Sequence, residues 1–497
     1  MDIKPYMAKF GFGCAGSRHI VVEQESKLWL AFASEGAGVF MMSSDSLAAG
    51  LLEINLMYDG QSIPYTYVAS ESLLEISSEH GKVSIAVDAC ARALRFDGEG
   101  VALRLDSKDT EQSTTNLNMT GGTVVSMGGG RYFFAAKRGC ISFDDTWVRN
   151  RFRSKAPVLD ITPDDGRLEL IAYDLPADEP MPEITKSLGE CAEANAAGFK
   201  AFCEKLIATP ADWGDVRENI AYLMWLNQRN VNGVNVILSN KLRSMDIDPV
   251  KLSAASLAFT CPTHAAALIT AAQGVSPAAQ GPATLRLFKD GLFEKVSRKT
   301  VFDLYSTLRE HLLWWTQHRT DCDPDLYFYA YRYEAGTAAN ALFKTGAPVY
   351  SPDINTHMIL ACKALGKLAD FTGNTADGEK WRERAKAIKK SLITNLWDGE
   401  KFVGKNVYSG EMVEAEEAIA LAPIMLGAML PKEISAILAK NVSGGICDPF
   451  TVLGLYRAGY EKQVKQIVTA QLNKARKKGM DDPYCGAALL ALAGTVL

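Results

Sequence analysis

The sequence lacks the features that place a chain in a membrane, in a secretory pathway or on nucleic acid. No stretch approaches the roughly 20 consecutive apolar residues of a membrane-spanning helix, because charges or glycines interrupt the longest apolar runs. The first residues, Met1-Asp2-Ile3-Lys4-Pro5, show no basic segment followed by an apolar one, so we expect no secretory signal and a cytoplasmic location. A net charge of −5 over 497 residues gives no positive electrostatic potential that would attract phosphate backbones, which argues against nucleic acid as a partner.

Clustered cysteines and the common catalytic signatures are also missing. The 10 cysteines show no C-x-x-C spacing, which favours reduced, buried thiols over disulfides or a zinc site. There is no G-x-S-x-G, no G-x-x-x-x-G-K-[ST], no H-E-x-x-H, and no G-x-G-x-x-G placed between a strand and a helix. Asp321, Asp323 and Asp325 alternate like calcium-loop ligands, but the glycine and the distal glutamate of such a loop are absent. We therefore expect neither a metal ion nor a cofactor.

The first part of the chain, residues 1–180, has the pattern of many short strands. Runs rich in β-branched and aromatic residues are separated by turn residues such as Gly128-Gly129-Gly130. These runs cover 20–23, 28–32, 83–87, 122–126 and 168–172. The pattern predicts an N-terminal β-sandwich domain.

From about residue 182 the apolar spacing becomes helical. Along 353–371, apolar residues recur at intervals of three and four and mark one helix face: Ile354, Met358, Cys362, Leu365 and Leu368. Residues 181–210 fit a linker helix, and residues 211–497 offer roughly eleven or twelve helical segments. Because the chain is longer than one hydrophobic core usually supports, we expect two domains joined near this linker.

A series of short motifs follows a fixed order through the helical part. It comprises Gln280-Gly281-Pro282, Trp314-Trp315, the acidic loop 321–326, Glu334-Ala335-Gly336-Thr337-Ala338, Ser351-Pro352-Asp353-Ile354-Asn355 and Leu396-Trp397-Asp398. The series resembles the order Q-P-P, W-W, D-x-D-G-L, E-S-G-x-D, S-P-D-L-N and L-W-D of glycoside hydrolase family 63 and its relatives, the trehalases and mannosylglycerate hydrolases. The resemblance implies an (α/α)6 barrel over residues 211–497. It also implies inverting hydrolysis of an α-linked oligosaccharide or glycoside, with a carbohydrate as the partner.

Two carboxyl groups on opposite sides of the scissile bond are required for inversion, one as acid and one as base. The acid of the resembled families is the aspartate of E-S-G-x-D, and that position is occupied here by Ala338. Glu334 is then the best remaining acid, although it could instead pair with Arg332 or another barrel residue as an orienting group. The late segment Gly479–Gly486 resembles the base segment, which makes Asp481 or Asp482 the candidate base. Asp482 could equally serve as the cap of the last helix, since Pro483 follows it.

The resemblance also suggests substrate contacts. Asp353 matches the aspartate of S-P-D-L-N, although capping of the following helix would explain it as well. Aromatic rings stack on sugars, so Tyr333 and Trp314 are candidates; adjacent Trp314 and Trp315 point about 100° apart on a helix, and at most one would face a pocket. The remaining candidates are Gln280, Arg332 and His264. His264 could instead be a buried core residue, since three alanines follow it in the sequence.

Two other functions fit the same pattern. A lyase, epimerase or other sugar-converting enzyme could use tyrosine or histidine on the same scaffold. A sugar-binding protein without catalysis would explain the alanine at position 338. Release of an unsaturated or isomerised product would select the first, and binding without turnover the second.

Overall fold

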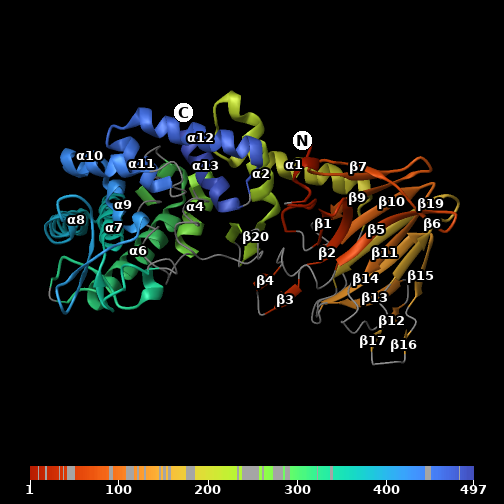
Figure 1. Cartoon of the computed structure of the whole chain (residues 1–497), viewed down its shortest axis with the longest axis horizontal. Coiled ribbons are helices and arrows are strands. Elements are labelled where there is room, and N and C mark those ends of the chain that lie inside the picture. The colour runs from red at the N-terminus through yellow and green to blue at the C-terminus, as the bar shows by residue number, and fades with distance from the viewer. Residues whose placement is uncertain are drawn as a thin grey trace.

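The computed structural model describes most of the chain. Its helical and β-rich parts lie side by side along the longest axis (Figure 1). The residues that it does not describe are 9, 17–18, 33, 37–38, 42–50, 89–92, 108–116, 120–121, 128–129, 145–146, 149–152, 155–157, 175–184, 232–233, 238–256, 260–261, 272–283, 286–291, 322, 336–339, 443–448 and 481. No helix within the described ranges is long and apolar enough to cross a membrane.

The N-terminal part contains two large sheets whose strands pair in antiparallel fashion. The seven-stranded sheet has the order β1 (His19–Gln24), β2 (Lys27–Phe32), β5 (Leu51–Tyr58), β11 (Ala102–Ser107), β18 (Val158–Thr162) and β15 (Cys140–Asp144), with β6 (Gln61–Ile63) paired to β5. The eight-stranded sheet has the order β12 (Leu117–Met119), β13 (Gly122–Met127), β14 (Gly130–Arg138), β19 (Arg167–Asp174), β10 (Ala93–Glu99), β9 (Lys82–Asp88), β8 (Leu74–Ser77) and β7 (Thr66–Ala69). Two short pairs accompany them, β3 (Ser34–Gly36) with β4 (Val39–Met41) and β16 (Trp147–Val148) with β17 (Arg153–Ser154).

The buried faces of the two large sheets belong to one apolar cluster. Ile54 and Leu105 of the first sheet and Ile85 and Phe96 of the second are fully buried within it. In β9 the buried Val83 and Ile85 flank the less buried Ser84, and every residue from Ile85 to Asp88 is buried. Each of the five runs that the sequence marks as a strand lies within a strand of the structure, so those predictions are confirmed.

The change from strands to helices falls where the sequence predicts it. The last strand of the β-rich part, β19, ends at Asp174, and α1 (Leu188–Lys205) follows with a capping box of Ser187 and Glu190. Helix α1 rests against β9, where the Asn195 side-chain amide donates to the Val87 carbonyl oxygen at 2.8 Å. The division of the chain into domains remains a prediction.

The C-terminal part is mainly helical in the described ranges. Its α-helices are α2 (Gly214–Leu226), α4 (Pro262–Ala271), α6 (Arg298–His318), α7 (Pro352–Thr372), α8 (Thr375–Leu396), α9 (Glu417–Leu421), α10 (Lys432–Asn441), α11 (Pro449–Arg457), α12 (Glu461–Lys478) and α13 (Pro483–Val496). Its 3-10 helices include η2 (Ala211–Trp213), η3 (Leu292–Lys295), η4 (Arg332–Ala335) and η5 (Ala422–Met429).

Helix α7 is the most buried helix near the candidate site. It begins at Pro352 and ends at Thr372, and Gly373 follows it with a φ of 88°, the left-handed conformation that favours glycine. The predicted apolar face, from Ile354 to Leu368, is fully buried. Burial extends beyond that face to Asn355, Thr356 and His357. Helices α6, α8 and η5 all pack against α7, which explains why its polar residues are enclosed.

Short strands interrupt the helical part, and the sequence pattern does not show them. A hairpin joins β20 (Gln228–Val231) to β21 (Val234–Ile237). A four-stranded sheet has the order β22 (Phe328–Tyr329), β23 (Val349–Tyr350), β24 (Gly404–Asn406) and β25 (Met412–Val413). Most of these strands have only two or three residues, which is too short for a visible alternation of apolar and polar positions.

Candidate active site

Glu334 is held by four N–H donors. Its Oε1 accepts from Nε and Nη2 of Arg319, at 3.0 and 2.5 Å, and its Oε2 accepts from the backbone N–H groups of Ala330 and Tyr331, at 2.7 and 3.4 Å. The side chain of Arg319 is only 14% exposed and that of Glu334 only 19%. Every donor favours the ionised carboxylate as acceptor. These contacts agree with the alternative in which Glu334 pairs with Arg332 or another residue, and the partner is Arg319.

Arg319 also contacts both tryptophans of the W-W motif. Its guanidinium carbon lies 4.8 Å from the ring centre of Trp314 and 5.8 Å from that of Trp315, distances typical of cation–π contacts. Trp315 is buried, whereas Trp314 is 45% exposed. Only Trp314 of the pair can therefore offer a ring face to a ligand from solvent.

Asp353 lies in the first turn of α7 and is anchored from two sides. The Tyr329 hydroxyl donates to its Oδ2 at 2.9 Å, and the Ser351 hydroxyl donates to its Oδ1. Burial raises the pKa of the Asp353 carboxyl, and these hydrogen bonds oppose that rise. Tyr329 also stacks edge-on against Trp315, with the ring centres 6.3 Å apart.

The structure thus links Trp314, Glu334 and Asp353 through two residues that the sequence analysis did not select. Arg319 connects Glu334 to the tryptophans, and Tyr329 connects Trp315 to Asp353. We call the six residues Trp314, Trp315, Arg319, Tyr329, Glu334 and Asp353 the Arg319 cluster. The only sequence signal for Arg319 was its position directly after the helix that contains the W-W motif. An arginine at such a position is not a motif by itself. Tyr333 is 90% exposed next to this cluster, and Arg332 is also exposed.

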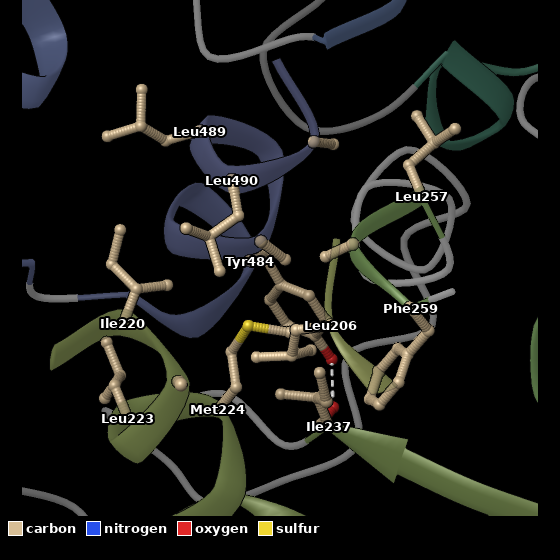
Figure 2. Packing of buried hydrophobic residues seen from close by; sticks show 14 of the residues in the cluster. Leu206, Ile220, Leu223, Met224, Ile237, Leu257, Phe259, Tyr484, Leu489 and Leu490 are labelled. Carbon is tan, nitrogen blue, oxygen red and sulfur yellow. Dashed lines mark hydrogen bonds between the residues drawn. The ribbon is translucent and has the colours of Figure 1, made fainter. Parts of the chain in front are cut away.

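Asp482 caps the last helix. Its Oδ1 accepts from the backbone N–H groups of Tyr484 and Cys485, each at 2.9 Å. The Tyr484 hydroxyl then donates to the Ile237 carbonyl oxygen at 2.5 Å, inside a group of apolar side chains from α2, α13 and their neighbours (Figure 2). The capping alternative for Asp482 is therefore confirmed, and its role as a base stays a prediction.

His264 lies on α4 with its ring 4.5 Å from that of Phe259. Burial, with a smaller contribution from the charge of Lys205, lowers the pKa of the His264 imidazole to about 4. These contacts are those of a neutral core histidine, the alternative given above. Gln280, Ala338 and Asp481 lie outside the described residues.

Two of the three aspartates in the acidic loop bind protein groups. Asp323 Oδ2 accepts from the Ser391 hydroxyl at 2.7 Å, and Asp325 pairs with Arg384 at 2.6 Å. Their carboxylates tie the loop to α8. The part of the chain that the structure describes holds no group of three or more histidine, cysteine, aspartate or glutamate side chains arranged for a metal ion.

Residues 259–445 match the family model of the mannosylglycerate hydrolase MGH1-like glycoside hydrolase domain. This part of the chain is therefore similar to a glycoside hydrolase domain. Trp314, Glu334 and Asp353 all fall within the matched range of this domain, whereas Asp482 lies beyond it. No curated protein matches the sequence.

Solved structures of glycosidases are similar to the chain at low identity. A bacterial glucoamylase complexed with acarbose is 9% identical, with 78% of this chain and 68% of that chain covered and a TM-score of 0.44. The family 63 mannosylglycerate hydrolase of Thermus thermophilus, in complex with glucose, is 14% identical, with 44% and 75% covered and a TM-score of 0.36. A family 92 inverting mannosidase of Bacteroides thetaiotaomicron is 9% identical, with 99% and 84% covered and a TM-score of 0.44.

Proposed function

We propose that the chain is an inverting glycoside hydrolase acting on an α-linked oligosaccharide or glycoside. The proposal includes an N-terminal β-sandwich over residues 1–180, a linker helix over 181–210 and an (α/α)6 barrel over 211–497. The match of residues 259–445 to a glycoside hydrolase domain supports the reaction class. The Arg319 cluster is the observation that supports the location of the site. It joins two carboxyl groups and an exposed tryptophan at the end of α6 and the start of α7.

In this proposal Glu334 donates the proton to the leaving group, and Asp482 or Asp481 activates the water. Both oxygens of Glu334 accept hydrogen bonds in the structure, so one of them must leave its donors and take up a proton when the glycoside binds. Tyr333 and Trp314 would supply ring faces to the sugar. Asp353, anchored by Tyr329, would accept hydrogen bonds from sugar hydroxyl groups.

The first test separates the acid from the base. Glu334→Gln is expected to lower turnover of natural glycosides by roughly 10²–10⁴-fold, because a general acid contributes that much. It should spare glycosyl fluorides, whose leaving group departs without a proton. Asp482→Asn should abolish turnover of both substrates if Asp482 is the base. Asparagine caps a helix as well as aspartate does, so this variant should keep its thermal stability.

Product analysis completes this test. Proton NMR of the first product from an α-glycosyl fluoride should show the β-anomer, whereas the α-anomer would rule out inversion. Equal loss of both substrate classes in Glu334→Gln would contradict its role as acid and favour the orienting role.

A sugar-binding protein without catalysis is the second candidate. The fully bonded Glu334 and the alanine at position 338 favour it. Under this alternative the wild-type protein binds a glycan tightly and turns over neither substrate class, and Ala338→Asp is expected to create activity.

A further inference from the structure

The first turn of α13 connects the candidate base to a distant strand through a single residue. The backbone N–H of Tyr484 donates to Oδ1 of Asp482 at 2.9 Å. The hydroxyl of the same residue donates to the carbonyl oxygen of Ile237 at 2.5 Å, and Figure 2 shows this bond. Ile237 is the last residue of β21 and lies 247 positions earlier in the chain. Opposite ends of Tyr484 therefore hold the carboxylate of Asp482 and the end of β21.

Close packing keeps Tyr484 in one position. Its side chain is 2% exposed and lies in the apolar group of Figure 2. The main chain of α13 is close to α2, because a Cβ atom on Gly486 would come within 2.8 Å of Cγ2 of Ile220. At the other end of α13, a Cβ atom on Gly494 would lie 2.4 Å from the carbonyl oxygen of Ala208. A buried ring on so closely packed a helix has little freedom, so its hydroxyl fixes the position of β21 relative to the first turn of α13.

The hairpin of β20 and β21 is held from another side by the N-terminal part. The carbonyl oxygen of Gln228, the first residue of β20, accepts from the backbone N–H of Gly16 at 3.1 Å. The segment before Gly16 also contacts α2, since the Tyr222 hydroxyl accepts from the N–H of Gly13 at 3.3 Å and donates to the carbonyl oxygen of Gly11 at 3.1 Å. The hairpin therefore offers an acceptor that is anchored independently of α13.

The carboxylate of Asp482 keeps one oxygen available for a ligand. Both of its hydrogen bonds, from the N–H groups of Tyr484 and Cys485, end on Oδ1. Within the part of the chain that the structure describes, Oδ2 has no hydrogen-bond partner, and the residue is only partly buried. A general base needs a free oxygen within reach of the proton that it removes. The bonds to Oδ1 set the direction in which Oδ2 points.

We propose that Tyr484 is a positioning residue, which acts on the proposed reaction through Asp482. The inference rests on the proposed function, in which Asp482 activates the water. Tyr484→Phe removes the donor to the Ile237 carbonyl oxygen, so the first turn of α13 is no longer tied to the hairpin. A displacement of about 1 Å lowers a catalysed rate by up to about 10²-fold, so we expect kcat to fall by roughly 10–100-fold. KM should stay near its wild-type value, because the buried ring does not reach the substrate.

Steady-state kinetics of the full chain test this expectation on a natural glycoside and on the matching glycosyl fluoride. Because both substrates need the attacking water, kcat should fall by the same factor for both, whereas Glu334→Gln should spare the fluoride. Tyr305→Phe is the matched control and should keep the wild-type kcat, since it removes a hydroxyl that donates to Asp377 between α6 and α8. Unchanged kcat in Tyr484→Phe, a rise in KM alone, or an equal loss in Tyr305→Phe would overturn the proposal.

Hydrogen–deuterium exchange separates this proposal from the proposed function. Absence of turnover of both substrates by the wild type would contradict the proposed hydrolysis, and exchange then tests the link between Tyr484 and the hairpin by itself. Tyr484→Phe should speed amide exchange in peptides that cover β20 and β21 and in those that cover the first turn of α13. Tyr305→Phe should leave both at wild-type rates. Unchanged exchange in the hairpin of Tyr484→Phe would show that the hydroxyl does not hold it.

Discussion

Replacing Arg319 by methionine is expected to lower the free energy of unfolding by roughly 3 kcal/mol, because it leaves the largely buried carboxylate of Glu334 without its cation. The two side chains are 14% and 19% exposed, so solvent screens the lost interaction only weakly. Arg319 also contacts two tryptophan rings, and methionine cannot replace those cation–π contacts. Urea unfolding of the wild type and the variant at pH 7 measures the difference.

A double-mutant cycle separates the ion pair from the packing of the arginine. Glu334→Gln in the Arg319→Met background removes the uncompensated charge and should recover part of the lost stability. Arg382→Met is the matched control, since Arg382 pairs with Asp370 at the surface, where the side chains are 41% and 43% exposed. Such exposed pairs contribute about 0–1 kcal/mol. An Arg319→Met variant no less stable than Arg382→Met would show that the pair at Glu334 does not organise the site.

Acid is expected to destabilise the protein well above the pH at which its carboxylates titrate. Burial lowers the pKa of His357 to about 3 and the pKa values of His264 and His311 to about 4. Nδ1 of His357 and Nε2 of His311 are buried without a hydrogen-bond partner among the described residues. In the unfolded chain the same side chains titrate near pH 6.5.

The sign of the effect follows from these pKa values. Between pH 6.5 and about 4 the unfolded chain binds protons that the folded protein cannot, so stability is fully present above pH 6.5 and decreases as the pH falls. Each histidine that stays neutral contributes a slope of up to about 1.4 kcal/mol per pH unit. His357→Leu should make the plot of unfolding free energy against pH shallower by about this amount over that range.

Denaturant unfolding at a series of pH values between 4 and 7 provides the measurement. The difference between wild type and variant isolates His357, because the carboxyl of Asp353 is present in both proteins. His80→Leu is the control, since His80 lies in a surface turn against Tyr58. Parallel plots for wild type and His357→Leu would mean that His357 takes up its proton in the folded protein.

Local sequence patterns were sufficient for five of the N-terminal strands and for the apolar face of α7. The strand runs 20–23 and 83–87 and the apolar face of α7 depend on spacing within a single element, where neighbouring residues alone define the period. Pro352 and Asp353 at the start of α7, and Asp482 before Pro483, are start signals that act within one turn. The match of residues 259–445 to a glycoside hydrolase domain agrees with the family that the ordered motifs suggested.

The partners of the candidate site residues could not be predicted in the same way. The sequence left Arg332 or another residue as the alternative partner of Glu334, and it gave no means to choose Arg319, which lies 15 positions earlier in the chain. The nearby strands β22 to β25 have two or three residues each, and they join segments from 328 to 413. The pairing of such strands depends on contacts between distant segments, which leave no period in the sequence.

The sequence by itself determined five strands of the N-terminal part, the buried face of α7, where α7 and α13 begin, and which short motifs point to a glycoside hydrolase. Only the tertiary structure decided that Arg319 neutralises Glu334 and that Tyr329 anchors Asp353. The physical reason is the distance along the sequence over which each effect acts. Propensity, periodicity and capping act over one or two turns, whereas charge pairing and burial depend on side chains that approach only when separate elements pack.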